Sequence, residues 1–318
     1  MEPVLLALDF GGTKHSAALL ASGERTWQRH GRVFSPPGAD ARYDRQAMLA
    51  LARGLLEGRQ PAAIGVSFGG PVDFPNGVVR LSHHVPGWES FPLAAWLERE
   101  LGAPARVDND ANVAALGEHL FGAGQGFSSL LYMTVSTGVG GGWIMNGQPW
   151  RGADGMAGEI GHTVVDPAGP VCLCGKRGCL ERLASGPYLA QTARERLAAG
   201  PESGAVLLEL AGGNPAAITG LTLSRAAEQG DALAWEVLER GAWALGVAIG
   251  NAANLVNPQL FVLGGGVAKS GKRFWGVIRR TAVQTALPEV RFEIVPARLG
   301  ADAPLWGAAA LAQDLLAD

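Results

Sequence analysis

The chain has 318 residues, of which 47% are hydrophobic and 17% are charged, and its formal net charge is -3. This length fits two domains of roughly 100 to 200 residues each, and the apolar fraction excludes a disordered or fibrous class. The small negative charge provides no basic field to attract nucleic acid or anionic lipid, so we expect neither as a partner.

The start of the chain, Met1-Glu2-Pro3, lacks the basic flank and cleavage site of a secretory signal. The longest weakly polar stretch, residues 242–256, is interrupted by Asn251 and Asn254 and is shorter than the roughly 20 apolar residues of a membrane helix. We therefore expect no membrane association and a cytoplasmic location.

Strands and helices alternate along the chain, which predicts an α/β fold. Residues 4–20 read as strand, glycine turn and strand, which predicts a hairpin, and residues 130–145 repeat this pattern. Two such hairpins indicate a duplicated architecture. Apolar spacing predicts helices at 45–56, 93–101, 111–121, 187–199, 224–254 and 304–316, and a strand at 260–263.

We expect two packed lobes, because no low-complexity linker separates parts of the chain. The small N-terminal lobe is predicted to cover residues 1–117, and the large lobe residues 118–302. In the last helix, Leu305, Ala308, Leu311 and Leu315 form one apolar face. We expect this helix, residues 303–318, to return to the small lobe.

The first motif with chemical potential is Asp9-Phe10-Gly11-Gly12-Thr13-Lys14, at the end of the first strand. Paired glycines let backbone N–H groups approach phosphate oxygens, and Thr13 and Lys14 add a hydroxyl and a positive charge. Asp9 is a candidate ligand for Mg²⁺. The alternative is an ordinary hairpin turn, while the P-loop and Rossmann patterns are absent from this segment.

Two more glycine-rich turns follow later in the chain. The first runs from Ser136 and Thr137 through Gly138 to Gly142, and it could face the first motif as the second half of a phosphate clamp. The other, Gly264-Gly265-Gly266, follows a strand and could admit a flat adenine ring against bare backbone. Each of these segments could equally be a tight turn without a ligand.

A polar cluster, Asp108-Asn109-Asp110, separates a strand from an alanine-rich helix. One Asx residue suffices as a helix N-cap, and three exceed that need. A carboxylate here could accept the proton of a sugar hydroxyl that attacks a γ-phosphate. Because phosphoryl transfer depends mainly on positioning and charge neutralisation, a weakly basic Asp is adequate.

All three cysteines lie within residues 172–179, and a clustered odd number favours metal over disulfide. Together with His162, the thiolates of Cys172, Cys174 and Cys179 form the Cys₃His set of a closed tetrahedral zinc site, which would be structural. Glu159 and Glu181 are interleaved with these ligands and could bind hydroxyl groups beside His162. Carboxylate pairs also occur in glycosidases, but these need no phosphate clamp.

These residues together resemble the ROK family of bacterial sugar kinases and related repressors, in the actin, hexokinase and Hsp70 superfamily. The match extends from Asp9 to the last helix. The segment from Gly161-His162 through Gly169, Cys172-x-Cys174-Gly175, Gly178-Cys179 and Glu181 resembles the zinc signature of the family closely.

The resemblance implies a two-lobed, actin-like (ribonuclease H-like) ATPase fold with a cleft between the lobes, and ATP-dependent phosphorylation of a hexose, with glucose as the first choice. Asp110 would be the general base. The sugar would be held by Gly70, Asn109, Asp110, Glu159, His162 and Glu181. ATP would be held by Asp9, Gly11, Gly12, Thr13, Lys14, Thr137, Gly138, Gly264, Gly265 and Gly266. Zn²⁺ would be structural, Mg²⁺ would accompany ATP, and the subunits would form a homodimer or homotetramer.

One departure from the family pattern concerns the sugar. Before Pro86-Gly87-Trp88 this chain has His83-His84-Val85, where glucokinase-like members usually carry Asn and an aliphatic residue. An N-acetylmannosamine, N-acetylglucosamine or fructose kinase therefore stays open, as does a donor such as polyphosphate or ADP. A repressor is disfavoured because Asp9 leaves no room for a winged-helix domain, and a non-catalytic sugar sensor because Asp110 and both phosphate turns are intact.

Overall fold

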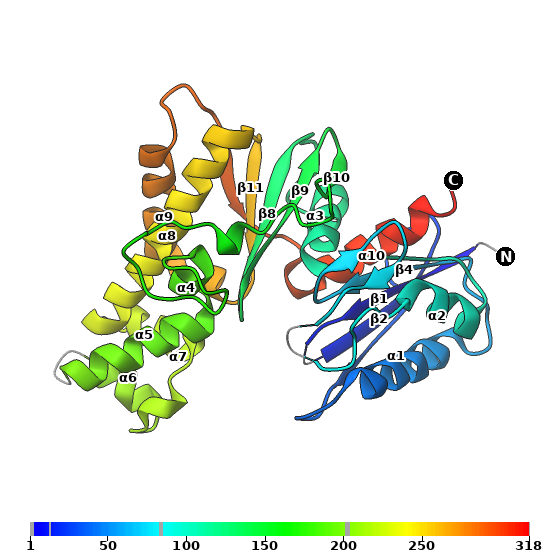
Figure 1. Ribbon diagram of the computed structural model, residues 1–318, viewed down its shortest axis with the longest axis horizontal. Helices are drawn as coiled ribbons and strands as arrows, with labels where there is room; N and C mark the ends of the chain where they lie inside the picture. Colours follow the sequence, from blue (N-terminus) through cyan, green and yellow to red (C-terminus); the bar gives the residue numbers. More distant parts are fainter. Residues whose placement is uncertain (1–2, 13, 83–84, 201–203, 318) are drawn as a thin grey trace. The chain divides into compact units, whose positions relative to one another are not determined.

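A computed structural model describes residues 3–12, 14–82, 85–200 and 204–317 (Figure 1). The chain divides into two compact units. The first contains Met1–Tyr132, Gly142–Gly158 and Ala297–Asp318, and the second contains Met133–Gly141 and Glu159–Pro296. Helices and strands alternate as the sequence predicts, which confirms the α/β class. The lobe boundaries expected at residues 117 and 302 remain predictions.

The first unit is built on a five-stranded sheet of order β3-β2-β1-β4-β7. Its strands are β1 (Val4–Phe10), β2 (Lys14–Ala21), β3 (Arg29–Phe34), β4 (Ala63–Phe68) and β7 (Ala105–Asn109). β1 and β2 form the predicted antiparallel hairpin, while β4 and β7 extend the sheet in parallel with β1. The carboxyl ends of β1, β4 and β7 therefore meet at one edge.

Side chains that alternate along β1 enter two different cores, as expected for a strand buried on both faces. Leu6 and Leu8 pack with α1 (Ala41–Leu56) and α2 (Leu93–Leu101). Leu5 and Ala7 pack with α3 (Asp110–Phe121) and α10 (Ala303–Asp314). A short β5 (Val72–Asp73) and β6 (Val78–Val79) form a separate two-stranded sheet.

The last helix, α10, lies close against both β4 and α3, because glycines remove the side chains between them. A Cβ on Gly65 of β4 would lie 1.7 Å from the carbonyl oxygen of Ala308, and a Cβ on Gly307 would lie 1.7 Å from that of Val113. Both distances are shorter than any real contact. The C-terminal residues thus complete the core of the first unit.

The second sheet has the order β10-β9-β8-β11-β12, so it repeats the arrangement of three successive strands followed by two later ones. Its strands are β8 (Leu130–Val135), β9 (Val139–Met145), β10 (Gln148–Trp150), β11 (Leu260–Gly264) and β12 (Glu293–Pro296). The helices of the second unit are α4 (Leu180–Ala184), α5 (Gly186–Ala199), α6 (Ala205–Leu210), α7 (Gly220–Glu228), α8 (Ala232–Val256) and α9 (Gly271–Thr285), and its 3₁₀ turns include η1 (Ile160–His162), η3 (Pro215–Ala217) and η4 (Val267–Lys269). A further 3₁₀ turn, η5 (Gly300–Asp302), precedes α10 in the first unit.

The single helix predicted over residues 224–254 is wrong in one respect, because it is two helices, α7 and α8. Gly230 adopts a left-handed conformation with φ of 89°, and the Asp231 carboxylate accepts the backbone N–H of Ala234 at 2.9 Å. These are the signals of a helix stop and a new N-cap. Gly246 of α8 packs closely on α9, since a Cβ there would lie 2.5 Å from Cβ of Thr281.

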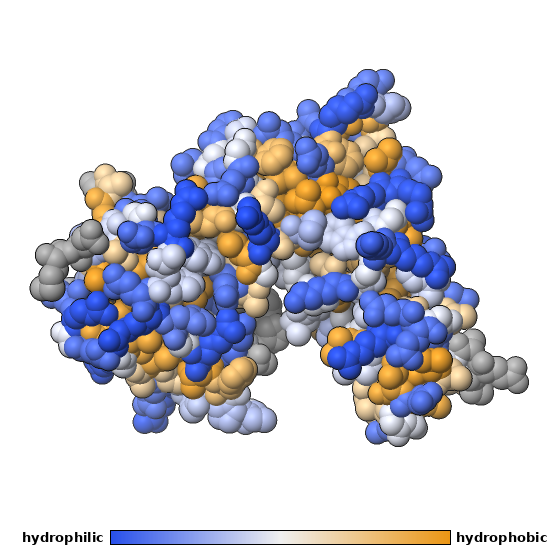
Figure 2. All heavy atoms as spheres, turned by 180° about the vertical axis from the view of Figure 1, so that it is seen from behind, coloured by the Kyte–Doolittle hydropathy of each residue, from blue (hydrophilic) through white to orange (hydrophobic). Residues whose placement is uncertain are grey.

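Hydrophilic side chains cover much of the face shown in Figure 2, with apolar side chains between them. Scattered apolar side chains are ordinary on protein surfaces. Among the helices that the structure describes, none is long and apolar enough to cross a membrane.

Candidate active site

The turn between β1 and β2 is tight and closed by its own backbone. The N–H of Gly11 donates to the carbonyl of Lys14 at 3.1 Å, and a Cβ on Gly11 would lie only 2.8 Å from that oxygen. Gly12 is exposed at the tip, and Lys14 begins β2. Thr13, the hydroxyl predicted here, lies outside the described residues.

Asp9 is a buried carboxylate just before this turn. It is 6% exposed and accepts the Ser67 hydroxyl at 2.9 Å. Burial raises the pKa of Asp9 from 3.8 to about 6, while the Ser67 hydrogen bond and the charge of Lys14 act in the opposite direction. A cation bound beside Asp9 would stabilise its charged form, which fits a role in binding a metal–phosphate complex.

The three residues 108–110, here called the polar turn, have three different local environments. Asn109 is the N-cap of α3, and its side-chain oxygen accepts the N–H of Ala111 at 3.0 Å. The Asp108 carboxylate is buried and pairs with Nε of Arg151 at 2.8 Å. Asp110 is half-buried in the first turn of α3. The Asp110 carboxylate also accepts the N–H of Ala111, at 2.9 Å, so it shares this hydrogen bond with Asn109.

Several predicted site residues of the first unit lie near one another at the carboxyl edge of its sheet. In register, Asp9 pairs with Ser67, and Ser67 pairs with Asp108, so the three residues form one row across β1, β4 and β7. The amide of Asn109 donates to the carbonyl of Gly70 at 3.1 Å. The structure therefore brings Asp9, Gly70 and the polar turn to one edge.

In the second unit, the Ser136 to Val139 turn lies against α4 and η1. Glu181 accepts the N–H of Val139 at 3.0 Å, and a Cβ on Gly138 would lie 2.7 Å from the same carboxylate oxygen. Gly161 of η1 also packs here, since its Cβ would lie 2.0 Å from the carbonyl oxygen of Val139. The predicted phosphate turn and Glu181 are therefore direct neighbours, while Glu159 is exposed at the start of η1.

The four residues predicted to bind a metal lie together. One candidate ligand atom from each of His162, Cys172, Cys174 and Cys179 falls within 4.8 Å of the others. The sulfur atoms of Cys174 and Cys179 are 3.5 Å apart, close to the ~3.8 Å expected for two thiolates on one tetrahedral zinc ion. Nδ1 of His162 is buried and has no hydrogen-bond partner among the described residues. The donor set and this orphaned nitrogen fit a metal ion.

Backbone contacts hold the loop around this cluster. Cys172 donates its N–H to the carbonyl of Lys176 at 2.8 Å, and Gly178 donates to that of Pro170 at 2.9 Å. Gly178 has a φ of 68°, and a Cβ there would lie 1.6 Å from the carbonyl oxygen of Asp166. Burial raises the pKa of Cys179 to about 12, so in the absence of metal this thiol stays protonated at neutral pH.

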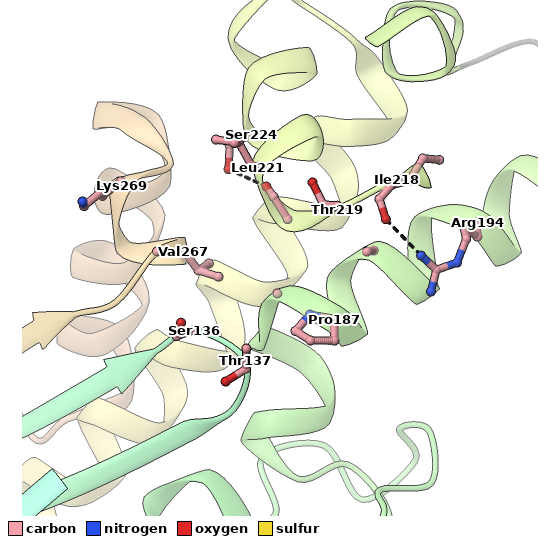
Figure 3. Close-up of a pocket in the computed structure, with 14 residues that line it drawn as sticks. Ser136, Thr137, Pro187, Arg194, Ile218, Thr219, Leu221, Ser224, Val267 and Lys269 are labelled. Atoms are coloured by element: carbon pink, nitrogen blue, oxygen red, sulfur yellow. Dashed lines mark hydrogen bonds between the residues drawn. The ribbon is translucent and has the colours of Figure 1, made fainter. Parts of the chain in front are cut away.

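A cavity of about 630 Å³ opens within the second unit between α5, α7 and the turn after β11 (Figure 3). It is lined by Ser136, Thr137, Gly186, Pro187, Ala190, Arg194, Ile218, Thr219, Gly220, Leu221, Ser224, Gly266, Val267 and Lys269. Of the predicted residues, Thr137 and Gly266 belong to this wall. Gly265 has a φ of 89° and no room for a Cβ, which would lie 2.3 Å from the carbonyl oxygen of Val135. Gly264 is buried at the end of β11.

Several residues of these sites were not predicted from the sequence. Ser67 and Arg151 hold the two buried carboxylates, at sequence separations of 58 and 43 residues, and no local pattern indicates such pairs. Arg194 lines the cavity and donates to the carbonyl of Ile218 at 3.0 Å. The apolar spacing of the sequence predicts the helix that carries Arg194, but it does not show that this helix borders a cavity. His83 and His84, where the sequence departs from the family pattern, lie outside the described residues.

Comparisons with known proteins agree with this architecture. The sequence profile of the ROK family matches residues 5–315. A glucokinase from Thermotoga maritima is 32% identical over 98% of this chain and 97% of its own. An N-acetylmannosamine kinase from Escherichia coli is 33% identical over 97% of this chain and 98% of its own.

A crystal structure gives the same result in three dimensions. The ROK family glucokinase from Streptomyces griseus, solved in complex with glucose and AMPPNP, is 36% identical, with a TM-score of 0.84 over 98% of this chain and 99% of its own. The α/β fold is that of the actin-like ATPases, as the resemblance implied. This protein belongs to the ROK family.

Proposed function

We propose that this protein transfers the γ-phosphoryl group of ATP to the 6-hydroxyl of glucose, forming glucose 6-phosphate and ADP. Its glucokinase relatives and the neighbour that binds glucose and AMPPNP support this activity. The observation that carries the assignment of the base is the place of Asp110 in the polar turn. Its half-buried carboxylate follows Asn109, whose amide contacts Gly70 at the carboxyl edge of the sheet, and the buried ion pair with Arg151 is made by Asp108.

In this proposal, the Asp110 carboxylate accepts the proton of the attacking hydroxyl as its oxygen bonds to phosphorus and the bond to the ADP oxygen breaks. The base need only be weak, because the transition state is loose and most of the acceleration comes from positioning. We assign sugar binding to Gly70 and Asn109 in the first unit, and to Glu159, His162 and Glu181 in the second.

We assign ATP binding to the two glycine turns and the cavity. The phosphates would meet backbone N–H groups of Gly11, Gly12 and Gly138, together with Lys14 and Thr137. The nucleoside would enter the 630 Å³ cavity, whose apolar wall includes Ile218 and whose polar groups include Arg194. A mostly apolar cavity with a few polar groups is typical of small-molecule sites.

We propose Asp9 as the carboxylate that interacts with Mg²⁺, directly or through water. The ion would neutralise the charge that develops on the phosphates. The buried position of Asp9, with its pKa raised to about 6, supports this role, because a cation would offset the cost of its charged form.

We propose Zn²⁺ for the cluster of His162, Cys172, Cys174 and Cys179. Four protein ligands would leave no open position, so the ion would hold the loop and orient His162 and would not activate water. Purified protein should contain one zinc ion per chain. Active protein without zinc would contradict this assignment.

The kinase proposal is tested by measuring ADP release with a panel of sugars. Wild-type protein should release ADP with glucose, and Asp110→Asn should lower kcat by about 10² to 10⁴-fold while binding of an ATP analogue persists. Glu289→Gln, an exposed carboxylate on a loop, serves as the control for the loss of a negative charge. A D110N variant with more than half of the wild-type kcat would refute the assignment of the base.

The second candidate is a kinase for N-acetylmannosamine or another sugar of this class, as suggested by the Escherichia coli relative. The same panel separates the two candidates. We expect glucose to have the highest kcat/KM, with N-acetyl sugars, mannose and fructose at least about tenfold lower, which corresponds to ~1.4 kcal/mol. If kcat/KM were higher for N-acetylmannosamine, the assignment as a sugar kinase would stand, but glucose would no longer be the proposed substrate.

We propose that the chain assembles as a homodimer or homotetramer, on the basis of the family resemblance. Light scattering of the purified protein over a range of concentrations tests this directly. A mass that stays at 33.0 kDa, the mass of one chain, would contradict it.

A further inference from the structure

Arg151 connects the polar turn to a distant segment of the same unit. Its Nε lies 2.8 Å from Oδ2 of Asp108, and its Nη1 donates to the carbonyl of Pro149 at 3.3 Å. The guanidinium carbon also lies 3.5 Å from the centre of the Phe74 ring. The side chain is therefore held on three sides, and its orientation is fixed.

Asp108 in turn holds the backbone of the polar turn. Its Oδ1 accepts the N–H of Asn109 at 2.7 Å and the amide of Asn112 at 3.3 Å. Its Oδ2 is the atom that faces Arg151. The carboxylate thus joins the guanidinium to the first residues of the segment that carries Asn109 and Asp110.

Arg151 favours the charged form of the Asp108 carboxylate. Asp108 is 3% exposed, and burial raises its pKa, while Arg151 is the strongest influence in the opposite direction. The other groups around it are the N–H of Asn109, the amide of Asn112 and, in the same row of the sheet, Ser67 with Asp9 beyond it. Arg151 is the cation that directly contacts Asp108 among these described neighbours.

We propose that Arg151 is a positioning residue for phosphoryl transfer, because its ion pair with Asp108 fixes the turn that presents Asn109 and Asp110 to the sugar. The inference rests on the proposed function, in which Asp110 is the base. It differs from a purely stabilising role, since loss of Arg151 should misplace the base even in protein that remains folded.

The first experiment compares Arg151→Met and Arg151→Lys with a matched control, Arg80→Met. Arg80 is exposed and donates to the carbonyl of Asp154, three residues from Arg151. We expect R151M to lower kcat by about 10 to 100-fold, because small misplacements of reacting groups have effects of this size. KM for ATP should change less than about twofold. The kcat of R151K should lie between those of R151M and wild type, because lysine keeps the charge but loses the planar guanidinium group.

The pH profile separates positioning from general loss of stability. Without the cation, Asp108 should be protonated at higher pH, so the acidic limb of kcat in R151M should move up by about one pH unit or more. R80M should keep the wild-type profile. Equal losses of activity at every pH, in parallel with the melting temperature, would overturn the proposal in favour of a structural role.

The double variant Asp108→Asn with Arg151→Met removes both charges and leaves no buried charge unpaired. We expect its kcat to exceed that of R151M by at least about tenfold, because the side-chain oxygen of the introduced amide can still accept the N–H of Asn109. If R151M does not fold, the double variant and R151K carry the test. Absence of any recovery in the double variant would count against the proposal.

A readout without turnover distinguishes failure of this inference from failure of the proposed function. Hydrogen exchange of the peptide that covers residues 108–113 should be at least about tenfold faster in R151M than in wild type or R80M. If wild-type protein phosphorylates no sugar, the proposed function fails, and if D110N stays active, the assignment of Asp110 as the base fails. Unchanged exchange in R151M would by itself overturn the positioning role of Arg151.

Discussion

Asp9 provides the sharpest prediction about stability, because its carboxylate is buried and hydrogen-bonded to the Ser67 hydroxyl. Its pKa of about 6 in the folded protein compares with an ordinary value of 3.8. At about 1.4 kcal/mol for each pH unit, this difference corresponds to ~3 kcal/mol. The charged form therefore destabilises the free protein by up to this amount.

The sign follows from the direction of the pKa change. Because the folded state binds the Asp9 proton more tightly, this group stabilises the fold fully below pH 3.8 and loses that contribution as the pH rises through about 6. Asp9→Asn mimics the protonated form and keeps an oxygen for the Ser67 hydroxyl. The free energy of unfolding of D9N should therefore equal that of wild type near pH 4 and should exceed it by about 1 to 3 kcal/mol at pH 8.

Urea unfolding at pH 4, 6 and 8, without nucleotide or Mg²⁺, measures this difference. Glu289→Gln is the matched control, because this carboxylate is exposed and should change the free energy of unfolding by less than about 0.5 kcal/mol at any pH. A D9N variant no more stable than wild type at pH 8, or a gain independent of pH, would refute the reasoning.

Three further predictions concern packing and the metal loop. Gly246→Ala should lower the free energy of unfolding by about 1 to 3 kcal/mol, because the added Cβ would lie 2.5 Å from Cβ of Thr281. The control in the same urea experiment is Gly54→Ala on α1, which should be neutral or stabilising because no atom lies within 4 Å of the added Cβ. Gly178→Ala should lower the zinc content measured by atomic absorption, since a Cβ cannot fit 1.6 Å from the Asp166 carbonyl, while full zinc occupancy would contradict this. A strong chelator should lower the melting temperature of wild-type protein, and an unchanged melting curve after verified zinc removal would argue against a structural ion.

Much of the fold could be predicted from apolar spacing and turn residues. The helix expected at residues 93–101 has these same bounds, and the hairpin of β1 and β2 is where the Gly11-Gly12 turn predicts it. The division of α7 from α8 was missed because long apolar periodicity outweighed one glycine. Gly230 followed by the cap residue Asp231 carried the signal.

The candidate site could be predicted only where its residues are close in sequence. The metal ligands lie within residues 162–179, and their spacing alone indicates the cluster. The roles within the polar turn could not be separated, because three adjacent Asx residues look alike until Arg151 is seen to contact Asp108 and Asn109 to cap α3. Such pairings depend on which strands become neighbours in the sheet.

The packing of α10 affects how the protein can form during synthesis. The core between the first sheet and α3 includes Leu305, Ala308 and Leu311, and Gly65 of β4 is matched to the backbone of this last helix. A ribosome completes β1, β2 and β4 long before it reaches residue 305. The part of this sheet face that α10 covers must therefore stay exposed, or be covered by other contacts, until residues 303–314 have emerged. Folding of the first unit can start early in synthesis, but its core cannot close before α10 is made.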